Sequence, residues 1–324
     1  MACKNICIFW YLRRFVWYRL GLLGRKCAAN FVVFDPNKEN TVKILGAEYS
    51  IVTVITAIIL AIFVGLVVIG GLQRIAKVSQ VVVPFMAIIS IVAVLVLIVA
   101  NIEKLPGALA TIVEYAFGAK AAAGGVLAAI GISMQKGIAR GIFSNEAGLG
   151  SAPIAAAAAK TKEPVRQGLV TMTGTFIDTI IVCTLTGLSI VMMGSYQVKG
   201  IEGVQVTTEA FQKGLHFLPG EVSAFILMIC LVFFAFTTIL GWDYYGERCL
   251  EYLTNRNKNA VKVYRWLYIL AVFIGPYMTV KAVWNIADIF NALMAFPNLI
   301  ALLALNGVIV KETRDFHSKH NGSY

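Results

Sequence analysis

Long stretches without charged residues recur along the chain. Three of them are uninterrupted and run from Ser50 to Leu72, from Val81 to Ala100 and from Val222 to Trp242. A helix needs about 20 apolar residues to cross about 30 Å of hydrocarbon, because each residue adds about 1.5 Å of rise. Each stretch therefore predicts one membrane-spanning helix.

Four further apolar stretches are shorter or contain a few polar residues; they cover residues 121–159, 168–194, 266–280 and 282–310. Together with the first three they predict about seven transmembrane helices. The predicted fold class is an all-α, polytopic membrane protein.

Basic residues gather in every second loop between the predicted spans. These loops contain the basic positions at 74–77, 160–166, 248–265 and 311–314, whereas the loops at 101–120 and 195–221 balance acids against bases. Lys and Arg accumulate on the cytoplasmic side of short loops. The alternation predicts a multi-pass protein of the inner (plasma) membrane with a cytoplasmic C-terminus.

Residues 1–45 depart from this pattern, because aromatic and basic residues alternate there too closely for a span. Two interpretations stay open. The segment is a basic amphipathic stretch on the membrane surface, or it is a leader that is foreign to the rest of the chain.

The composition excludes several function classes. The chain is 59% hydrophobic and 14% charged, with a net charge of +11, whereas soluble domains have about 25% charged residues. The basic excess belongs to the loops, so no nucleic-acid partner is predicted. The histidines lie in loops or the tail and the polar residues form isolated clusters, which argues against a membrane enzyme and a channel; the histidines are His216, His317 and His320.

A glycine-rich stretch at 137–153 carries polar residues at membrane depth, namely Arg140, Ser144, Asn145 and Glu146. Glycine weakens a helix by about 1 kcal/mol per site, so the stretch predicts a broken helix. Freed backbone groups at that depth hold ions or a small zwitterion. Alternatively, the glycines form a helix-packing face and Arg140 pairs with Glu146.

Two other polar features lie inside predicted spans. Asp178 is an intramembrane carboxylate with two possible roles. In a functional role it carries protons or positions a cation; in a structural role it binds Arg140 or Thr175 and holds two helices together. The adjacent hydroxyls of Thr237 and Thr238 suit a sodium ion, or each bonds to a carbonyl one helical turn earlier. Asp288 and Asn291 predict a polar seam that faces other helices; it receives no role.

The stretch from 138 to 161, IARGIFSNEAGLGSAPIAAAAAKT, closely resembles the alanine or glycine:cation symporter family of the amino acid-polyamine-cation superfamily. Further matches to the family occur at residues 70–77, 83–86, 176–179, 238–247, 283–288 and 297–301. The resemblance covers about residues 51–316 and implies a transporter.

The resemblance implies a LeuT-type fold of two inverted five-helix repeats. Residues 46–104 are then the last two helices of the first repeat, 121–316 the second repeat and 317–324 a cytoplasmic tail, behind the atypical 1–45. Residues 143–150 are expected to be unwound. The implied substrate-binding residues are Phe143, Ser144, Asn145 and Gly148, and the implied sodium ligands are Thr237 and Thr238.

The implied function is sodium-coupled symport of alanine, glycine or a similar small neutral amino acid by alternating access in the lipid bilayer, with no cofactor besides sodium. Family members carry further helices upstream, including a second broken helix. The chain is therefore expected to be N-terminally truncated and inactive in transport alone. The alternative is a non-transporting remnant or a membrane interaction protein.

Overall fold

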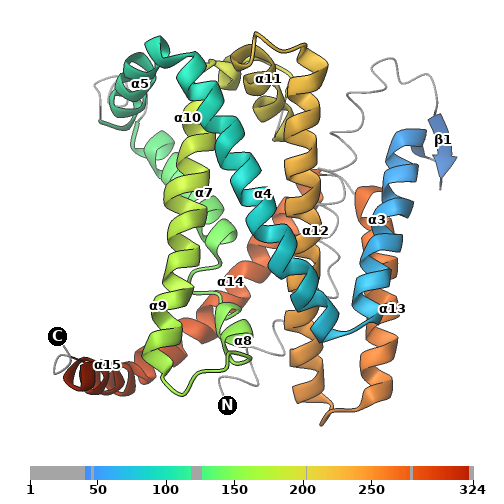
Figure 1. Ribbon diagram of the computed structural model, residues 1–324, viewed down its shortest axis with the longest axis vertical. Coiled ribbons are helices and arrows are strands. Elements are labelled where there is room, and N and C mark those ends of the chain that lie inside the picture. The colour runs from blue at the N-terminus through green and yellow to red at the C-terminus, as the bar shows by residue number, and fades with distance from the viewer. Residues whose placement is uncertain (1–40, 45–46, 118–125, 202, 278–279, 321–324) are drawn as a thin grey trace.

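The computed structural model describes residues 41–44, 47–117, 126–201, 203–277 and 280–320. Most of these residues are helical (Figure 1). A short antiparallel hairpin of β1 (Thr41–Ile44) and β2 (Ala47–Ser50) precedes the helices, with Thr41 opposite Ser50. Residues 1–40, which make up most of the atypical leader, lie outside the described residues.

The helices of the first part are α3 (Ile51–Ile69), α4 (Leu72–Ala100), α5 (Leu105–Phe117), α7 (Val126–Asn145) and the short α8 (Ala152–Ala156). The next continuous rod consists of α9 (Pro164–Thr175), a π-helical segment η3 (Phe176–Cys183) and α10 (Thr184–Met192). The remaining helices are α11 (Val204–Gly214), α12 (Gly220–Leu253), α13 (Lys258–Ile274), α14 (Val280–Ala304) and α15 (Asn306–His320).

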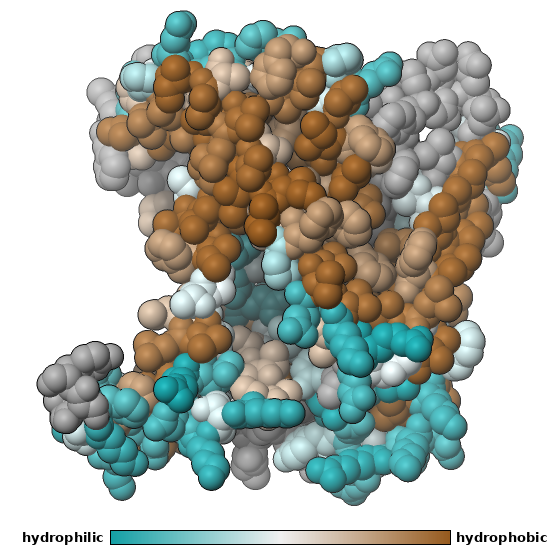
Figure 2. Space-filling model, viewed as in Figure 1, coloured by the Kyte–Doolittle hydropathy of each residue, from teal (hydrophilic) through white to brown (hydrophobic). Residues whose placement is uncertain are grey.

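Four helical stretches in the described part are long and apolar enough to cross a membrane; they are residues 73–100, 164–192, 220–253 and 284–304. Residues 53–69 form a shorter apolar helix. Figure 2 shows broad apolar surface above a hydrophilic lower edge. The all-α, polytopic prediction is therefore confirmed, while the number of seven spans stays a prediction.

The basic loops share one end of the molecule. The α3–α4 turn, the α8–α9 loop, the α12–α13 connection and α15 all lie toward the bottom of Figure 1. This arrangement agrees with the alternation of loop charge along the sequence. Which side of the membrane this end faces stays a prediction.

Two spans differ in extent from the sequence pattern. The last span, expected to reach Val310, ends at Ala304, because α15 carries Lys311, Glu312 and Arg314 and runs along the lower edge instead (Figure 1). The second span starts nine residues before Val81. Its first turns contain Arg74, whose guanidinium donates back to the Leu66 carbonyl at 3.0 Å.

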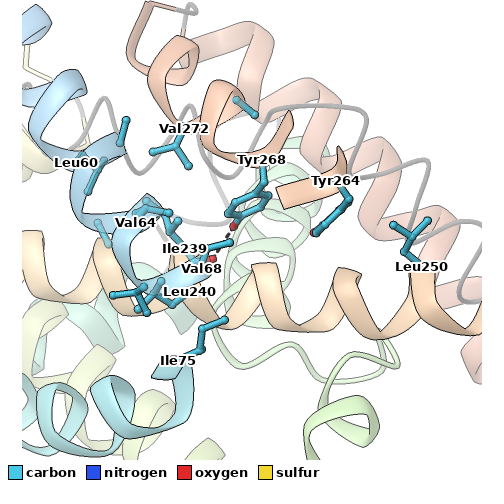
Figure 3. Close-up of a cluster of buried hydrophobic side chains, with 14 residues drawn as sticks. Leu60, Val64, Val68, Ile75, Ile239, Leu240, Leu250, Tyr264, Tyr268 and Val272 are labelled. Carbon is cyan, nitrogen blue, oxygen red and sulfur yellow. Dashed lines mark hydrogen bonds between the residues drawn. The ribbon is translucent and has the colours of Figure 1, made fainter. Parts of the chain in front are cut away.

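The packing of α3, α12 and α13 forms one side of the molecule. Leu60 and Val64 of α3 meet Ile239 and Leu240 of α12, and Val272 of α13 lies against them (Figure 3). The Tyr268 hydroxyl donates to the Ile239 carbonyl at 2.5 Å, which joins α13 to α12. This cluster fixes α12, the helix that carries the two threonines of the candidate sodium site.

Candidate functional site

The glycine-rich stretch is a broken helix, as predicted. The last helical residue of α7 is Asn145, and α8 begins at Ala152. Between them the backbone takes positive φ at Glu146 (58°), Gly148 (73°) and Gly150 (76°). Glycine adopts this conformation without steric cost, whereas Glu146 is strained. The break starts at Glu146, so the expectation that unwinding begins at Phe143 is wrong.

Side chains from other helices hold the break in place. Asn298 of α14 donates to the Gly148 carbonyl at 2.9 Å. A Cβ on Gly150 would lie 3.0 Å from the Asn298 Oδ1 atom, so a side chain at this position would crowd the Asn298 carboxamide. Leu149 is fully buried in a cluster with Trp242 of α12 and Met294 of α14. The broken segment is therefore anchored by both helices.

Local hydrogen bonds complete the turn. The Asn145 carboxamide accepts from the Ala147 backbone N–H at 3.0 Å, and the Ser151 hydroxyl donates to the Glu146 carboxylate at 2.5 Å. Asn and Ser side chains stabilise non-helical backbone in this way. The Ser-Asn-Glu run thus builds the break.

The end of α7 is tied to the π-helical segment η3. Ser144 donates to the Asp178 carboxylate at 2.6 Å, and Asn145 donates to the Thr179 hydroxyl at 3.1 Å. The partners expected for Asp178 in a structural role, Arg140 and Thr175, are therefore wrong, because the partner is Ser144 and depends on how the helices pack. π-Helical turns occur often at functional sites, and nothing in the local sequence had indicated this one.

Arg140 reaches α14. Its Nη2 atom donates to both carboxylate oxygens of Asp288, at 2.9 and 2.7 Å. Its guanidinium carbon lies 3.7 Å from the ring centre of Trp284, and Trp284 also contacts the Phe143 ring at 5.0 Å. The carboxylate partner expected for Arg140 was Glu146, so that pairing is corrected; Asp288 of the polar seam receives this role.

A cavity of about 670 Å³ opens beside the break; it is lined by Glu146 of the break and by residues of α4, α7, η3, α10, α11, α12 and α14. Figure 2 shows a hollow near mid height with hydrophilic side chains inside it. Six of the sequence-predicted residues line the cavity: Arg140, Phe143, Ser144, Glu146, Thr237 and Thr238. Asn145, Gly148 and Asp178 are absent from this lining and support the wall through the contacts above.

The threonine hydroxyls of α12 donate to carbonyls of their own helix. Thr237 donates to Phe233 at 3.0 Å, and Thr238 donates to Phe234 at 2.8 Å. These are the bonds that the structural interpretation predicted. Each hydroxyl oxygen keeps lone pairs that can accept or coordinate. No group of three or more His, Cys, Asp or Glu residues that suits a metal occurs in the described residues.

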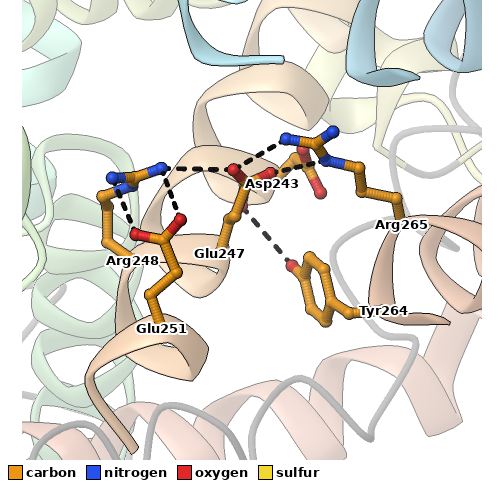
Figure 4. A network of polar contacts seen from close by, with 6 residues as sticks. All are labelled: Asp243, Glu247, Arg248, Glu251, Tyr264 and Arg265. Atoms are coloured by element: carbon orange, nitrogen blue, oxygen red, sulfur yellow. Dashed lines mark hydrogen bonds and ion pairs between the residues drawn. The ribbon is translucent and has the colours of Figure 1, made fainter. Parts of the chain in front are cut away.

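A charged cluster that the sequence had not indicated lies at the end of α12; it consists of Asp243, Glu247, Arg248, Glu251 and Arg265 (Figure 4). The Glu247 carboxylate binds Arg265 of α13 through two bonds of 2.9 Å and Arg248 at 3.2 Å. Only 3% of the Glu247 side chain is exposed. The spacing of Asp243 and Glu247 by one helical turn was the available sequence signal.

The family model described as the sodium:alanine symporter family matches residues 26–323. An uncharacterized transporter of Haemophilus influenzae is 52% identical over 84% of this chain and 59% of its own length. The sodium/alanine symporter AgcS of Methanococcus maripaludis is 45% identical over the same shares. The probable sodium/glutamine symporter GlnT of Bacillus subtilis is 38% identical over 88% of this chain and 58% of its own length.

The chain thus spans about three fifths of the length of these relatives. The model match covers most of its residues, and the broken helix that carries the most specific motif lies within the match. The chain belongs to the sodium:alanine symporter family, a family of transporters.

Proposed function

We propose that this chain acts in sodium-coupled symport of a small neutral amino acid such as alanine or glycine, by alternating access. The observation that carries the proposal is the break between Asn145 and Ala152 beside a cavity in a membrane-spanning bundle. Substrates and coupling ions of such transporters bind near the midplane where helices are discontinuous. The relatives named above as sodium symporters of alanine and glutamine support the same class of cargo.

The cavity lining suits a small zwitterion. Ser144 and the residues of the break supply polar groups at one side, with Asn145 and Gly148 fixing the backbone behind them. Phe143 contacts Trp284 and forms an aromatic wall. Such a wall leaves room for the methyl group of alanine and disfavours bulky side chains.

Sodium is proposed to bind at the Thr237 and Thr238 hydroxyls. Both side chains line the cavity from α12. Hard cations prefer oxygen ligands, and hydroxyl and carbonyl oxygens supply them without a carboxylate. The carbonyls released at the break of α7 complete such a site in discontinuous-helix transporters. Asp178 stabilises the break through Ser144 in this proposal.

The repeat assignment and orientation follow the family resemblance. We place α3 and α4 as the last two helices of the first repeat, and α7 at the start of the second. The basic end then faces the cytoplasm together with the C-terminus, in the inner membrane. Cysteine labelling from either side of the membrane at exposed Lys258 and Lys199 tests this orientation, because Lys258 begins α13 at the basic end, whereas Lys199 lies in the connection between α10 and α11 at the opposite end (Figure 1).

The test of the function is binding of radiolabelled L-alanine to the purified 324-residue chain in sodium and in choline. The proposal predicts saturable binding that sodium strengthens. Binding that is equal in both salts would contradict the sodium coupling, and no binding would contradict the function. Uptake of L-alanine into vesicles that contain the chain, driven by a sodium gradient, then tests symport itself.

A further inference from the structure

Arg140 is the one basic residue among the described residues that line the cavity. We propose that its guanidinium binds the carboxylate of the transported amino acid. The inference rests on the proposed function and adds a specificity-determining residue: it restricts the substrate to molecules with a free carboxylate.

The hydrogen-bonding of Arg140 is incomplete. Both bonds to Asp288 come from Nη2, while Nη1 is buried and has no hydrogen-bond partner among the described residues. A buried donor without a partner is unfavourable. A carboxylate oxygen that approaches from the cavity side would give Nη1 a partner while Nη2 keeps its bonds to Asp288.

The guanidinium is also held in a defined plane. Trp284 covers one face at 3.7 Å, and the edge contact with Asp288 fixes the rotation within that plane. Because Nη2 is bonded to Asp288, the substrate carboxylate accepts from Nη1, and little side-chain freedom is lost on binding since the guanidinium is already oriented. About one third of the Arg140 side chain is exposed, which leaves it accessible from the cavity.

The charge balance of the cavity favours the same assignment. A zwitterion that enters an apolar, aromatic-lined space needs a cation near its carboxylate. Glu146, six residues further along the chain, is the one acidic residue of the described lining. The described lining thus carries one charge of each sign, as suits the two ends of a zwitterion.

The competing explanation is that Arg140 has only a structural role, as a clasp that joins α7 to α14 through its ion pair with Asp288. The two explanations differ for Asp288→Asn, whose amide oxygen still accepts from Nη2. A clasp supports the fold and does not contact the substrate, so both variants would then weaken the binding of alanine and of alaninamide alike and leave the preference between them unchanged. A carboxylate-binding residue depends on the guanidinium, so Arg140→Gln is the more harmful change.

The experiment measures binding of L-alanine and of L-alaninamide, which lacks the carboxylate, to the full chain in saturating sodium. Arg140→Gln is expected to weaken alanine binding by roughly tenfold or more, as for loss of a charge-assisted hydrogen bond. The preference for alanine over alaninamide should fall by a similar factor. Asp288→Asn should weaken alanine binding by less than about threefold, which is a smaller effect than the loss of one charge-assisted hydrogen bond.

Lys136→Gln is the matched control, because Lys136 is an exposed cation one turn earlier on α7 and outside the cavity lining. It should leave both affinities unchanged. The double variant Arg140→Gln with Asp288→Asn removes both charges and guards against misfolding caused by an unpaired Asp288. It should bind alanine as weakly as Arg140→Gln alone.

The outcomes separate the two proposals. If the unmodified chain binds no alanine, the proposed function and the role of Arg140 both fail. If it binds alanine and Arg140→Gln binds it equally well, only the role of Arg140 fails. Two further results would also show that Arg140 has only a structural role. One is that Arg140→Gln keeps the preference of the chain for alanine over alaninamide; the other is that Asp288→Asn weakens alanine binding as much as Arg140→Gln does.

Discussion

Substitutions at Glu247 of the charged cluster test how α12 and α13 are held together. Its carboxylate is 3% exposed and bonds to Arg265 and Arg248, thereby joining α12 to α13. The neighbouring Glu251, one turn later, is 26% exposed and pairs with Arg248 at 2.8 Å. Replacing each acid with Gln removes one negative charge from the same cluster at two different depths.

The expected magnitudes follow from burial. Removing one partner of a buried ion pair costs about 3–5 kcal/mol, because the other charge stays buried without compensation. Gln at 247 keeps one hydrogen-bond acceptor and Arg265 is 22% exposed, so we expect about 3 kcal/mol, the lower end of that range. Glu251→Gln should cost less than about 1 kcal/mol, as for solvent-exposed pairs.

A double variant separates charge from packing. Glu247→Met combined with Arg265→Met replaces the pair with apolar side chains, and such replacements are often neutral or stabilising. The double variant should therefore be more stable than either single Met variant, although it stays below the unmodified chain because buried Asp243 loses the nearby charge of Arg265.

Equilibrium unfolding of the purified chain in mixed micelles, followed by tryptophan fluorescence, measures these differences. Trp242 lies on α12, five residues before Glu247, and is 9% exposed, so its emission reports on this region. Equal free-energy changes for Glu247→Gln and Glu251→Gln would refute the reasoning. So would a double Met variant that is less stable than either single variant.

Four further substitutions test the site, and Gly137→Ala among them is the control for Gly150→Ala. Gly150→Ala should lower the unfolding free energy by roughly 1–2 kcal/mol, because the backbone φ there is +76° and the Asn298 side chain is close. Gly137 lies in α7 with open space around the position of a Cβ, so Gly137→Ala should raise the unfolding free energy by up to about 1 kcal/mol in the same assay. Asn298→Ala should cost about 1–3 kcal/mol by the same assay, since the Gly148 carbonyl loses its donor. Thr238→Val should raise the sodium concentration for half-maximal alanine binding about tenfold, as for one lost bond to a charged group.

The spans could be predicted from sequence where apolar residues dominate, and their ends could not. The uncharged run from Ser50 to Leu72 corresponds closely to α3. The run that ends at Trp242 continues as helix to Leu253, and Glu247 in this extension pairs with Arg265 from the next helix. The sequence shows where the apolar run ends, but the end of the helix and the partners of its charged residues depend on the packing against the next helix.

The candidate site shows the same division. Gly148 and Gly150 predict the break, because few other residue types adopt positive φ. The partners of the polar side chains were not predictable, since Arg140 and Asp288 are separated by 148 positions and Ser144 and Asp178 by 34. Which of several possible acids meets a given base depends on the helix packing, and one-dimensional spacing carries no information about it.

The central claim is that the cavity beside the broken helix binds sodium and a small neutral amino acid together. Calorimetric titration of the purified chain with L-alanine at a series of sodium concentrations tests it most directly. Coupled binding predicts an alanine affinity that rises with sodium and then saturates, with alanine strengthening sodium binding by the same factor. An alanine affinity that does not change with sodium concentration would contradict the account.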